Sequence, residues 1–469
     1  MDFVQVETTA PLTLKIPQIA TPSTANSRIP KETIRTSLKA STADSVLAAV
    51  YSLGTGGILL SNFLVELGAS PVVFGMLSSI PMLVNLIQPL GAYLSERSTS
   101  RFQYSVWTHG IGRLLWLVLV IGIVSVSWGV VNTNQLVILT LLIVLFSHLL
   151  GGLGTASWLT WVAMIVPRRL RGRYFGIRNS AASLTNLVCV PVAGLAVSHW
   201  YGGTLQGYGV VLLVSIVFGI VGLGCQYFQV DMNPQLQNTY YGKSPQTNDI
   251  QPEIAKNESS EILQSIHPPQ DQLTNSIWKN SNFLIFLLYF SFWTLAVNLS
   301  APFFNLYMLD TLNLDVSYVT IYNSLQAGAN LLMLILWGKL ADKIGNRSIL
   351  ICIGILVAAT PLLWLGISVN RFDIWLWLPL LHILSGGTWA AIDLCSNNIQ
   401  LDIAPMKNQS IYFAIAAAVT GASGALGATI GSFIVQFAQF GGLLGLFSLS
   451  SLFRLAAIIP LLFVKEPGR

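Results

Sequence analysis

The sequence predicts an all-α membrane protein with twelve transmembrane helices in two six-helix bundles. Three observations support this fold class. Hydrophobic residues make up 53% of the 469 residues and charged residues only 9%, whereas soluble domains average about 25% charged. Twelve apolar runs are each long enough to cross a bilayer. The second half of the chain repeats a pattern of the first half at a fixed offset, as in a duplicated bundle.

Each apolar run is judged by length, because about 20 residues of helix cross the hydrocarbon core of a membrane. The runs fall at 44–66, 71–94, 104–127, 135–165, 174–198, 207–229, 280–308, 316–338, 348–368, 374–402, 410–436 and 441–464. We therefore expect a disordered tail over 1–43, an N-terminal bundle over 44–229, a linker over 230–279, a C-terminal bundle over 280–464 and a short tail over 465–469. The linker is rich in Gln, Asn, Ser and Pro, which is typical of flexible segments.

The repeat is clearest in the segments that follow the fourth and tenth runs. Pro167 is followed seven residues later by Tyr174-Phe175, and Pro405 is followed seven residues later by Tyr412-Phe413. The offset between the two segments is 238 residues, about half of the chain. This spacing predicts two structurally equivalent halves.

The distribution of basic residues predicts the orientation. Twenty-one of the 24 Lys and Arg residues lie on the same side as the N-terminus, and Arg371 alone lies in a loop on the other side. Cytoplasmic loops carry the excess of Lys and Arg, so we expect both termini in the cytoplasm and the protein in the cell (inner) membrane. The formal charge of +5 is not pooled on one segment, which argues against a nucleic-acid partner. The N-terminus lacks the apolar core of a secretory signal; a transit peptide stays open as an alternative, because residues 8–31 contain no acidic residue.

One charged stretch between two apolar runs, WGKLADKIGNRSIL at residues 337–350, resembles the G-x-L-A-D-R/K-x-G-R/K-R/K-x-x-L motif of the major facilitator superfamily. Asn346 departs from the motif, where a basic residue is usual. The first half holds a weaker copy at residues 91–97, with Ser95 in place of the aspartate and Glu96 one position later. The segment 167–176 is similar to the family's P-x-x-x-R-G loop. With the helix count and topology, the resemblance covers residues 45–464.

The resemblance implies a cytoplasmic gate, in which Asp342 meets the start of the fifth span near Arg173 and so joins the two halves. A helix N-terminus attracts an anion through its free N–H groups and its dipole. By pseudo-symmetry, Glu96 is expected to meet the start of the eleventh span near Ser410. The alternative is that these charges only hold their loops in the cytoplasm. The expected gate residues are Gly338, Asp342, Lys343, Gly345, Arg347, Glu96, Arg171, Arg173 and Asp402.

Ionisable residues inside apolar runs indicate a functional cavity, because they are costly in lipid. Asp393 shares a helix face with Trp389 and Asn397 by helical spacing. It can bind a solute or take up a proton; the alternative is a structural ion pair with Arg454, which lies at a similar depth in the twelfth run. The resemblance implies that the first, fourth, seventh and tenth spans surround the central site. The predicted cavity residues are Tyr51, Thr55, Asn62, Trp293, Trp389, Asp393 and Asn397.

The sequence contains no nucleotide-binding loop, metal-ligand cluster or activated nucleophile. The four cysteines lie singly in apolar runs, so neither a disulfide framework nor a zinc site is predicted. We expect no enzyme activity, cofactor or metal. The favoured function is secondary transport of a small solute by alternating access, with proton coupling through Asp393 as a hypothesis. The expected partners are the solute, protons and the lipid bilayer, and the expected state is a monomer. The alternative is a non-transporting sensor or assembly partner built on the same scaffold.

Overall fold

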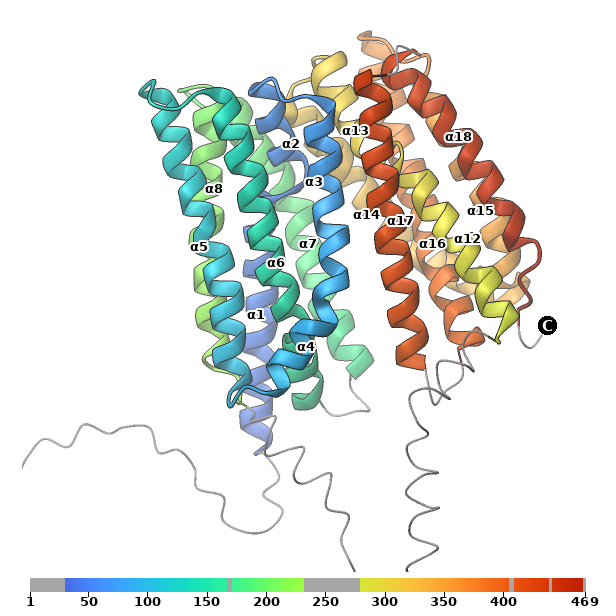
Figure 1. Ribbon diagram of the computed structural model, residues 1–469, viewed down its shortest axis with the longest axis horizontal. Helices are drawn as coiled ribbons and strands as arrows, with labels where there is room; N and C mark the ends of the chain where they lie inside the picture. The colour runs from blue at the N-terminus through green and yellow to red at the C-terminus, as the bar shows by residue number, and fades with distance from the viewer. Residues whose placement is uncertain (1–29, 167–170, 232–278, 405–408, 438–440, 467–469) are drawn as a thin grey trace, which may run out of the picture.

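The computed structural model describes residues 30–166, 171–231, 279–404, 409–437 and 441–466, and these residues form two groups of helices (Figure 1). The first group contains α1 (Lys31–Thr55), α2 (Gly57–Glu66), α3 (Pro71–Val84), η1 (Asn85–Ile87), α4 (Gln88–Glu96), α5 (Arg101–Ser127), α6 (Thr133–Ile165), α7 (Arg171–Ser198) and α8 (Thr204–Gln226). We call this group the N-half.

The second group, the C-half, follows the same order. It contains α12 (Ser281–Asn298), α13 (Ala301–Leu306), η3 (Tyr307–Thr311), α14 (Val316–Ile344), α15 (Asn346–Ala359), η4 (Thr360–Trp364), η5 (Asp373–Trp377), α16 (Leu378–Ile403), α17 (Gln409–Phe437) and α18 (Gly442–Leu461). The predicted all-helical fold is confirmed, and several predicted spans are divided into two helical pieces.

Eleven helical segments among the described residues are long and apolar enough to cross a membrane, and the shorter apolar segment Pro71–Ile87 lies where the second span is predicted. That span is divided because Pro81 lies inside α3 and Pro89 lies at the start of α4, with the 3₁₀ turn η1 between them. Proline removes a backbone donor and crowds the preceding turn of a helix. The chain is therefore a multi-pass integral membrane protein.

The first helix begins earlier than the sequence predicts. The tail was expected to extend to residue 43, but α1 starts at Lys31, after Pro30. Tertiary hydrogen bonds stabilise the additional turns: the Val230 N–H donates to Ser37 Oγ at 3.1 Å, and Tyr174 Oη donates to the Leu38 carbonyl at 3.1 Å. A hydropathy pattern does not reveal such contacts. Residues 1–29 of the tail and residues 232–278 of the linker lie outside the described residues.

We name the two ends of the molecule by their loops. The basic end holds the start of α1, the α4–α5 turn and the α14–α15 turn, with Lys31, Arg97 and Arg347; it is the lower end in Figure 1. The far end holds the α2–α3 turn and the α7–α8 turn. At the basic end both halves close a helix start in the same way: Asp231 accepts from the Phe102 N–H at 3.0 Å, and Glu466 accepts from the Asn346 N–H at 2.9 Å. These equivalent caps agree with the predicted repeat.

The halves meet along two helix pairs, α3 with α17 and α7 with α14. At the far end α2 also contacts α13, η3 and α14. One buried apolar cluster runs across this end, from Phe63 and Tyr208 in the N-half to Phe303, Tyr307 and Phe447 in the C-half. In Figure 1 α3 runs beside α17, whereas α4 bends away from α17 toward the basic end. The far end is therefore closed by apolar packing.

Candidate solute site

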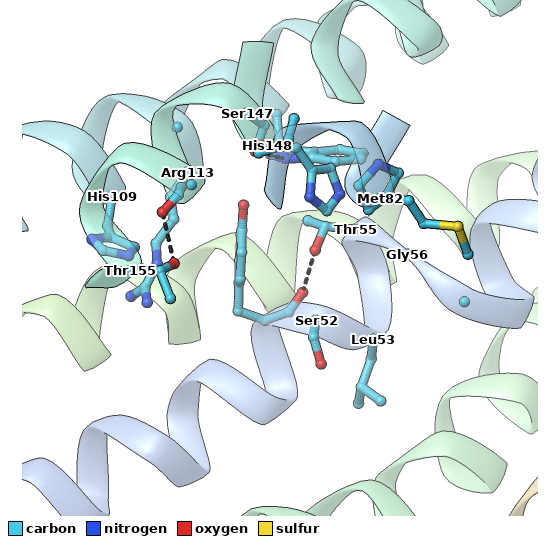
Figure 2. A pocket seen from close by; sticks show the side chains of 18 of the residues that line it. Ser52, Leu53, Thr55, Gly56, Met82, His109, Arg113, Ser147, His148 and Thr155 are labelled. Carbon is cyan, nitrogen blue, oxygen red and sulfur yellow. Dashed lines mark hydrogen bonds between the residues drawn. The ribbon is translucent and has the colours of Figure 1, made fainter. Parts of the chain in front are cut away.

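A cavity of about 780 Å³ lies inside the N-half (Figure 2). Its walls come from the α1–α2 junction, the end of α3, η1, α4, α5, α6 and α7. Volumes of about 300–1,000 Å³ are typical of small-molecule sites. The cavity is therefore large enough for a solute of the size of a monosaccharide or a nucleoside.

Two interrupted helices contribute backbone to this cavity. The chain breaks between α1 and α2 because Gly56 is fully extended (φ −169°) and Gly57 takes a φ of +61°, which favours glycine. Non-helical backbone at membrane depth occurs where it is buried in protein or lines a water-filled cavity. Both glycines line the cavity, and so does Asn85 of the 3₁₀ turn η1. The breaks thus place non-helical backbone beside the cavity.

The lining also carries fixed polar side chains. The Trp116 indole donates to Ser147 Oγ at 2.9 Å, and Gln88 Nε2 donates to Asn85 Oδ1 at 2.9 Å. The Asn186 Oδ1 atom is buried and has no hydrogen-bond partner among the described residues. A buried acceptor without a partner costs about 1–3 kcal/mol. A bound solute with a hydroxyl or N–H donor would satisfy it.

Arg113 of α5 is the cationic residue of this lining, and it is 7% exposed. Its guanidinium donates to the Gly219 carbonyl of α8 and lies 5.2 Å from the centre of the Tyr51 ring. Asp44 of α1 lies close enough to interact electrostatically with Arg113 and with Arg178. The positive charge of Arg113 in the cavity wall is thus partly balanced by Asp44, which lies outside the lining.

A hydrogen-bonded chain connects this carboxylate to the cavity. Gln226 Nε2 donates to Asp44 Oδ2 at 3.1 Å, and Gln226 Oε1 accepts from Ser105 Oγ at 2.9 Å. The Ser105 carbonyl in turn accepts from His109 Nδ1 at 3.2 Å. His109 and His148 both line the cavity. The chain links α1, α8 and α5 and fixes the orientation of the His109 ring.

A second cavity, of about 230 Å³, lies in the C-half. Trp389 and His382 of α16 line it together with Arg454 of α18. Arg454 is 3% exposed. Both halves therefore place one buried arginine beside a cavity, but on different helices.

The structure distributes the predicted cavity residues over several places. Tyr51 and Thr55 line the N-half cavity and Trp389 lines the C-half cavity. Asn62 and Trp293 are buried, 6% and 2% exposed, outside these two linings.

Asp393 and Asn397 are exposed on α16. No ion pair joins Asp393 to Arg454 in the part of the chain that the structure describes. The arginine instead donates to the Val357 and Val297 carbonyls and to Ser450 and Ser300 hydroxyls.

The predicted gate residues lie at the basic end. Gly345 forms the α14–α15 turn with a φ of +90°, which explains the glycine. Gly338 is loosely packed, since a Cβ there would meet only Leu394 at 4.0 Å. Arg347 donates from Nε to the Leu461 carbonyl at 3.3 Å, so it ties α15 to α18 within its own half.

The remaining gate residues are placed by their helices. Asp342 and Lys343 lie in the last turn of α14, and Asp402 is exposed near the end of α16. Arg171 and Arg173 begin α7 and Glu96 ends α4; the side chains of these three, and of Ser410, lie outside the described residues.

Sequence reasoning missed three ionisable residues that lie in or behind the walls of the two cavities. Asp44, Arg113 and His382 are ionisable residues inside apolar helices, which is a signal for function in itself. Arg113 and Asp44 are 69 positions apart in the sequence, so no local pattern links them. Asn186 and the Gly56-Gly57 break have no distinctive sequence context.

Comparisons with known proteins agree with this architecture. A family model described as the MFS_1 like family matches residues 54–441. The search of curated proteins gave no match. Among solved structures, a D-xylose-proton symporter aligns with a TM-score of 0.66 and 14% identity over 93% of this chain and 99% of its own.

Two further solved structures are similar at the same level. A bacterial homologue of the iron transporter ferroportin, in an inward-facing state, aligns with a TM-score of 0.64 and 13% identity over 93% of this chain and 99% of its own. The nucleoside transporter NupG aligns with a TM-score of 0.62 and 12% identity over 91% and 98%. At these identities the structures show a shared fold.

Proposed function

Since this chain belongs to the MFS_1 like family of membrane transporters, we propose that it carries a small polar solute across the membrane by alternating access. The observation that supports this most directly is the N-half cavity, with interrupted helices and an unpartnered Asn186 acceptor, in a molecule whose far end is closed. A rocking motion of the two halves would expose this cavity to the opposite side. A non-transporting sensor would need neither the cavity nor the gate.

The proposed orientation follows from charge. The basic end carries nearly all of the Lys and Arg residues of the loops, which favours a cytoplasmic position for this end and for both termini. Closure of the far end by the apolar cluster would then make this state inward-facing. We propose the cell membrane as the site of action.

Proton coupling is proposed through Asp393. This carboxylate is exposed on α16, one helical turn from Trp389 of the C-half cavity. A protonatable group on that face can gain or lose a proton as the halves rock. Uptake into proteoliposomes with and without an imposed pH gradient tests the coupling. Solute flux that ignores the gradient in the wild type, or that keeps its response in Asp393→Asn, would contradict it.

The transport function is tested by filling the N-half cavity. Gly151 lines this cavity, and a Cβ at this position would meet nothing within 4 Å. Gly151→Leu should lower initial uptake by at least about tenfold, since the side chain occupies solute volume and about 1.4 kcal/mol of lost binding already accounts for that factor. Uptake into proteoliposomes from a broad solute panel is the measurement.

Gly224→Leu is the matched control for this experiment. Gly224 is also a helical glycine with nothing within 4 Å of a Cβ, but it lies on the exposed side of α8 and outside the cavity. It should keep wild-type uptake. Equal uptake by both variants, at equal yields of folded protein, would show that the cavity does not carry the solute.

The gate at the basic end is proposed for the opposite, outward-facing state. There Asp342 at the end of α14 would meet the start of α7, where the anion is attracted by free N–H groups. Glu96 would meet the start of α17 in the same way. These contacts would balance the apolar closure of the far end.

Asp342→Asn should therefore favour the inward-facing state. A charge at a helix N-terminus contributes about 0.3–1 kcal/mol, which corresponds to a two- to fivefold change in the population ratio. Labelling of single cysteines introduced at either end measures that ratio. Lys339→Gln, one turn earlier on α14, is the control and should leave the population ratio unchanged. If Asp342→Asn also leaves the ratio unchanged, the proposed gate is wrong.

A further inference from the structure

Arg454 is a buried cation whose partners are all neutral. It is 3% exposed, and its guanidinium contacts two backbone carbonyls and two serine hydroxyls. The shortest of these contacts joins Nη2 to Ser300 Oγ at 2.9 Å. These partners satisfy hydrogen bonds but supply no negative charge.

A buried charge normally has a counter-charge, because an unpaired ion in a low-dielectric interior is costly. Among the described residues, no carboxylate forms an ion pair with Arg454. The linings of the N-half and C-half cavities also contain no Asp or Glu. A ligand that enters the cavity would supply the counter-charge that the described residues do not.

The C-half cavity has the size and the polar groups for an organic anion. Its volume of about 230 Å³ exceeds that of a simple inorganic ion. Asn323 Nδ2 donates to the Val319 carbonyl at 3.0 Å, which leaves its amide oxygen free to accept. The lining combines amide, imidazole, indole and guanidinium groups from Asn305, Asn323, Gln326, His382, Trp389 and Arg454.

His382 adds a second requirement on the ligand. Its Nδ1 atom lies 2.7 Å from the Leu378 carbonyl, and a carbonyl can only accept, so Nδ1 carries the proton. The Nε2 atom of the neutral ring is then an acceptor. A bare anion would be repelled by that lone pair, whereas a ligand hydroxyl would donate to it.

We propose that the C-half cavity binds a hydroxylated organic anion, whose carboxylate or phosphate pairs with Arg454 and whose hydroxyl groups donate to His382 and the amide oxygens. This inference rests on the proposed transport function: the transported solute would contact both halves during the rocking cycle, and its anionic group would pair with Arg454 of the C-half. It narrows the substrate from any small polar solute to sugar acids, hydroxy acids and sugar phosphates.

The test compares anionic probes with neutral hydroxylated analogues. Purified full-length protein, in chloride-free buffer, is titrated with D-gluconate against D-glucose and with glycerol 3-phosphate against glycerol, and binding is followed by thermal unfolding. At least one anion should bind at least about tenfold more tightly than its neutral analogue, as expected when a partner charge is added to a buried cation. Preference for gluconate identifies a carboxylate, and preference for glycerol 3-phosphate identifies a phosphate. Neutral members that bind as well as their anionic analogues would overturn the proposal.

Variants then assign the preference to the residue. Arg454→Gln should abolish the charge preference, and Arg454→Lys should retain part of it, because lysine keeps the charge but loses the planar fork. Arg371→Gln removes an exposed arginine outside both cavities and is the control. An unaltered preference in Arg454→Gln would overturn the proposal.

Two outcomes are kept apart by this design. If Arg454→Gln does not fold, the wild-type comparison of charged and neutral probes still decides the question. A second outcome is that the protein takes up a neutral solute, that Gly151→Leu blocks this uptake, and that no anion is preferred. This result would support the transport function and contradict only the proposed anion specificity.

Discussion

The N-half and the C-half share one fold but treat their buried arginines differently. In the N-half, Arg113 lies near Asp44, and that carboxylate is held by Gln226. In the C-half, Arg454 has hydroxyl and carbonyl partners only. A half with an internal counter-charge can remain rigid without a ligand, whereas the other half gains its missing charge on binding. The two halves therefore share a helical arrangement but differ in the charges around their buried arginines.

The largest effect on stability is expected when Arg113 loses the nearby carboxylate of Asp44. Asp44→Asn removes the nearby negative charge that offsets the buried Arg113 and changes the group that Gln226 contacts, which should cost about 1–3 kcal/mol. The free energy of unfolding should fall by an amount of that order, measured by tryptophan fluorescence on purified protein. Asp310→Asn removes an exposed carboxylate and is the control. If Asp44→Asn lowers the free energy of unfolding no more than this control does, Asp44 does not stabilise the buried charge of Arg113.

A smaller effect is expected at the far end, where one hydrogen bond joins the halves directly. Ser198 Oγ of α7 donates to Asp315 Oδ2, while Ser317 donates to Asp315 Oδ1 from within the C-half. Ser198→Ala should weaken far-end closure by about 0.5–1.5 kcal/mol, seen as faster labelling of a cysteine placed at that end. Ser317→Ala removes a bond to the same carboxylate inside one half. Ser317→Ala should not change the labelling rate. Equal effects of the two variants would mean that the Ser198–Asp315 bond does not contribute to far-end closure.

The smallest effect concerns pH. Partial burial acts to raise the pKa of Asp315, but hydrogen bonds from Ser198 and Ser317 outweigh it and hold the pKa below its ordinary value of 3.8. A lowered pKa means that the closed form favours the ionised carboxylate. The contribution is therefore complete above the ordinary value and is lost as the pH falls through the lowered one. The charge of His199 also acts to lower the pKa of Asp315. In a His199→Gln variant, far-end labelling should therefore not vary between about pH 5 and pH 8; a change within that range would assign the closure to another titrating group.

Much of the fold could be predicted from the sequence because lipid imposes a simple rule on length and hydropathy. The twelve predicted runs all coincide with helical segments, and the family is confirmed. Interruptions were missed because Gly56-Gly57 and Pro81 do not change the mean hydropathy of their runs. The early start of α1 was missed because its first turns are polar and are stabilised by tertiary contacts.

The site was harder to predict because depth in a membrane does not determine rotation about a helix axis. Asp393 and Arg454 were matched by depth, yet Asp393 is exposed on α16 while Arg454 donates to α12 and α15 carbonyls. The glycines of α17 allow its close approach to α12. A Cβ at Gly427 or Gly431 would indeed overlap the Leu295 or Leu299 carbonyl of the α12 segment. Spacing within one helix revealed small residues, but partners on other helices required the structure.

The interface between α3 and α17 has a mechanical consequence. Gly75 faces Ser432 without room for a Cβ, and Ser79 Oγ lies 3.0 Å from both the Ala425 carbonyl and Thr429 Oγ1. Bulky side chains that interlocked at every turn of this interface would resist tilting of the two halves. Glycine and hydroxyl groups let α3 and α17 approach closely, and Met82 of α3 packs against Gly424 of α17. In the proposed rocking motion, this closely packed pair would be the contact about which the two halves tilt.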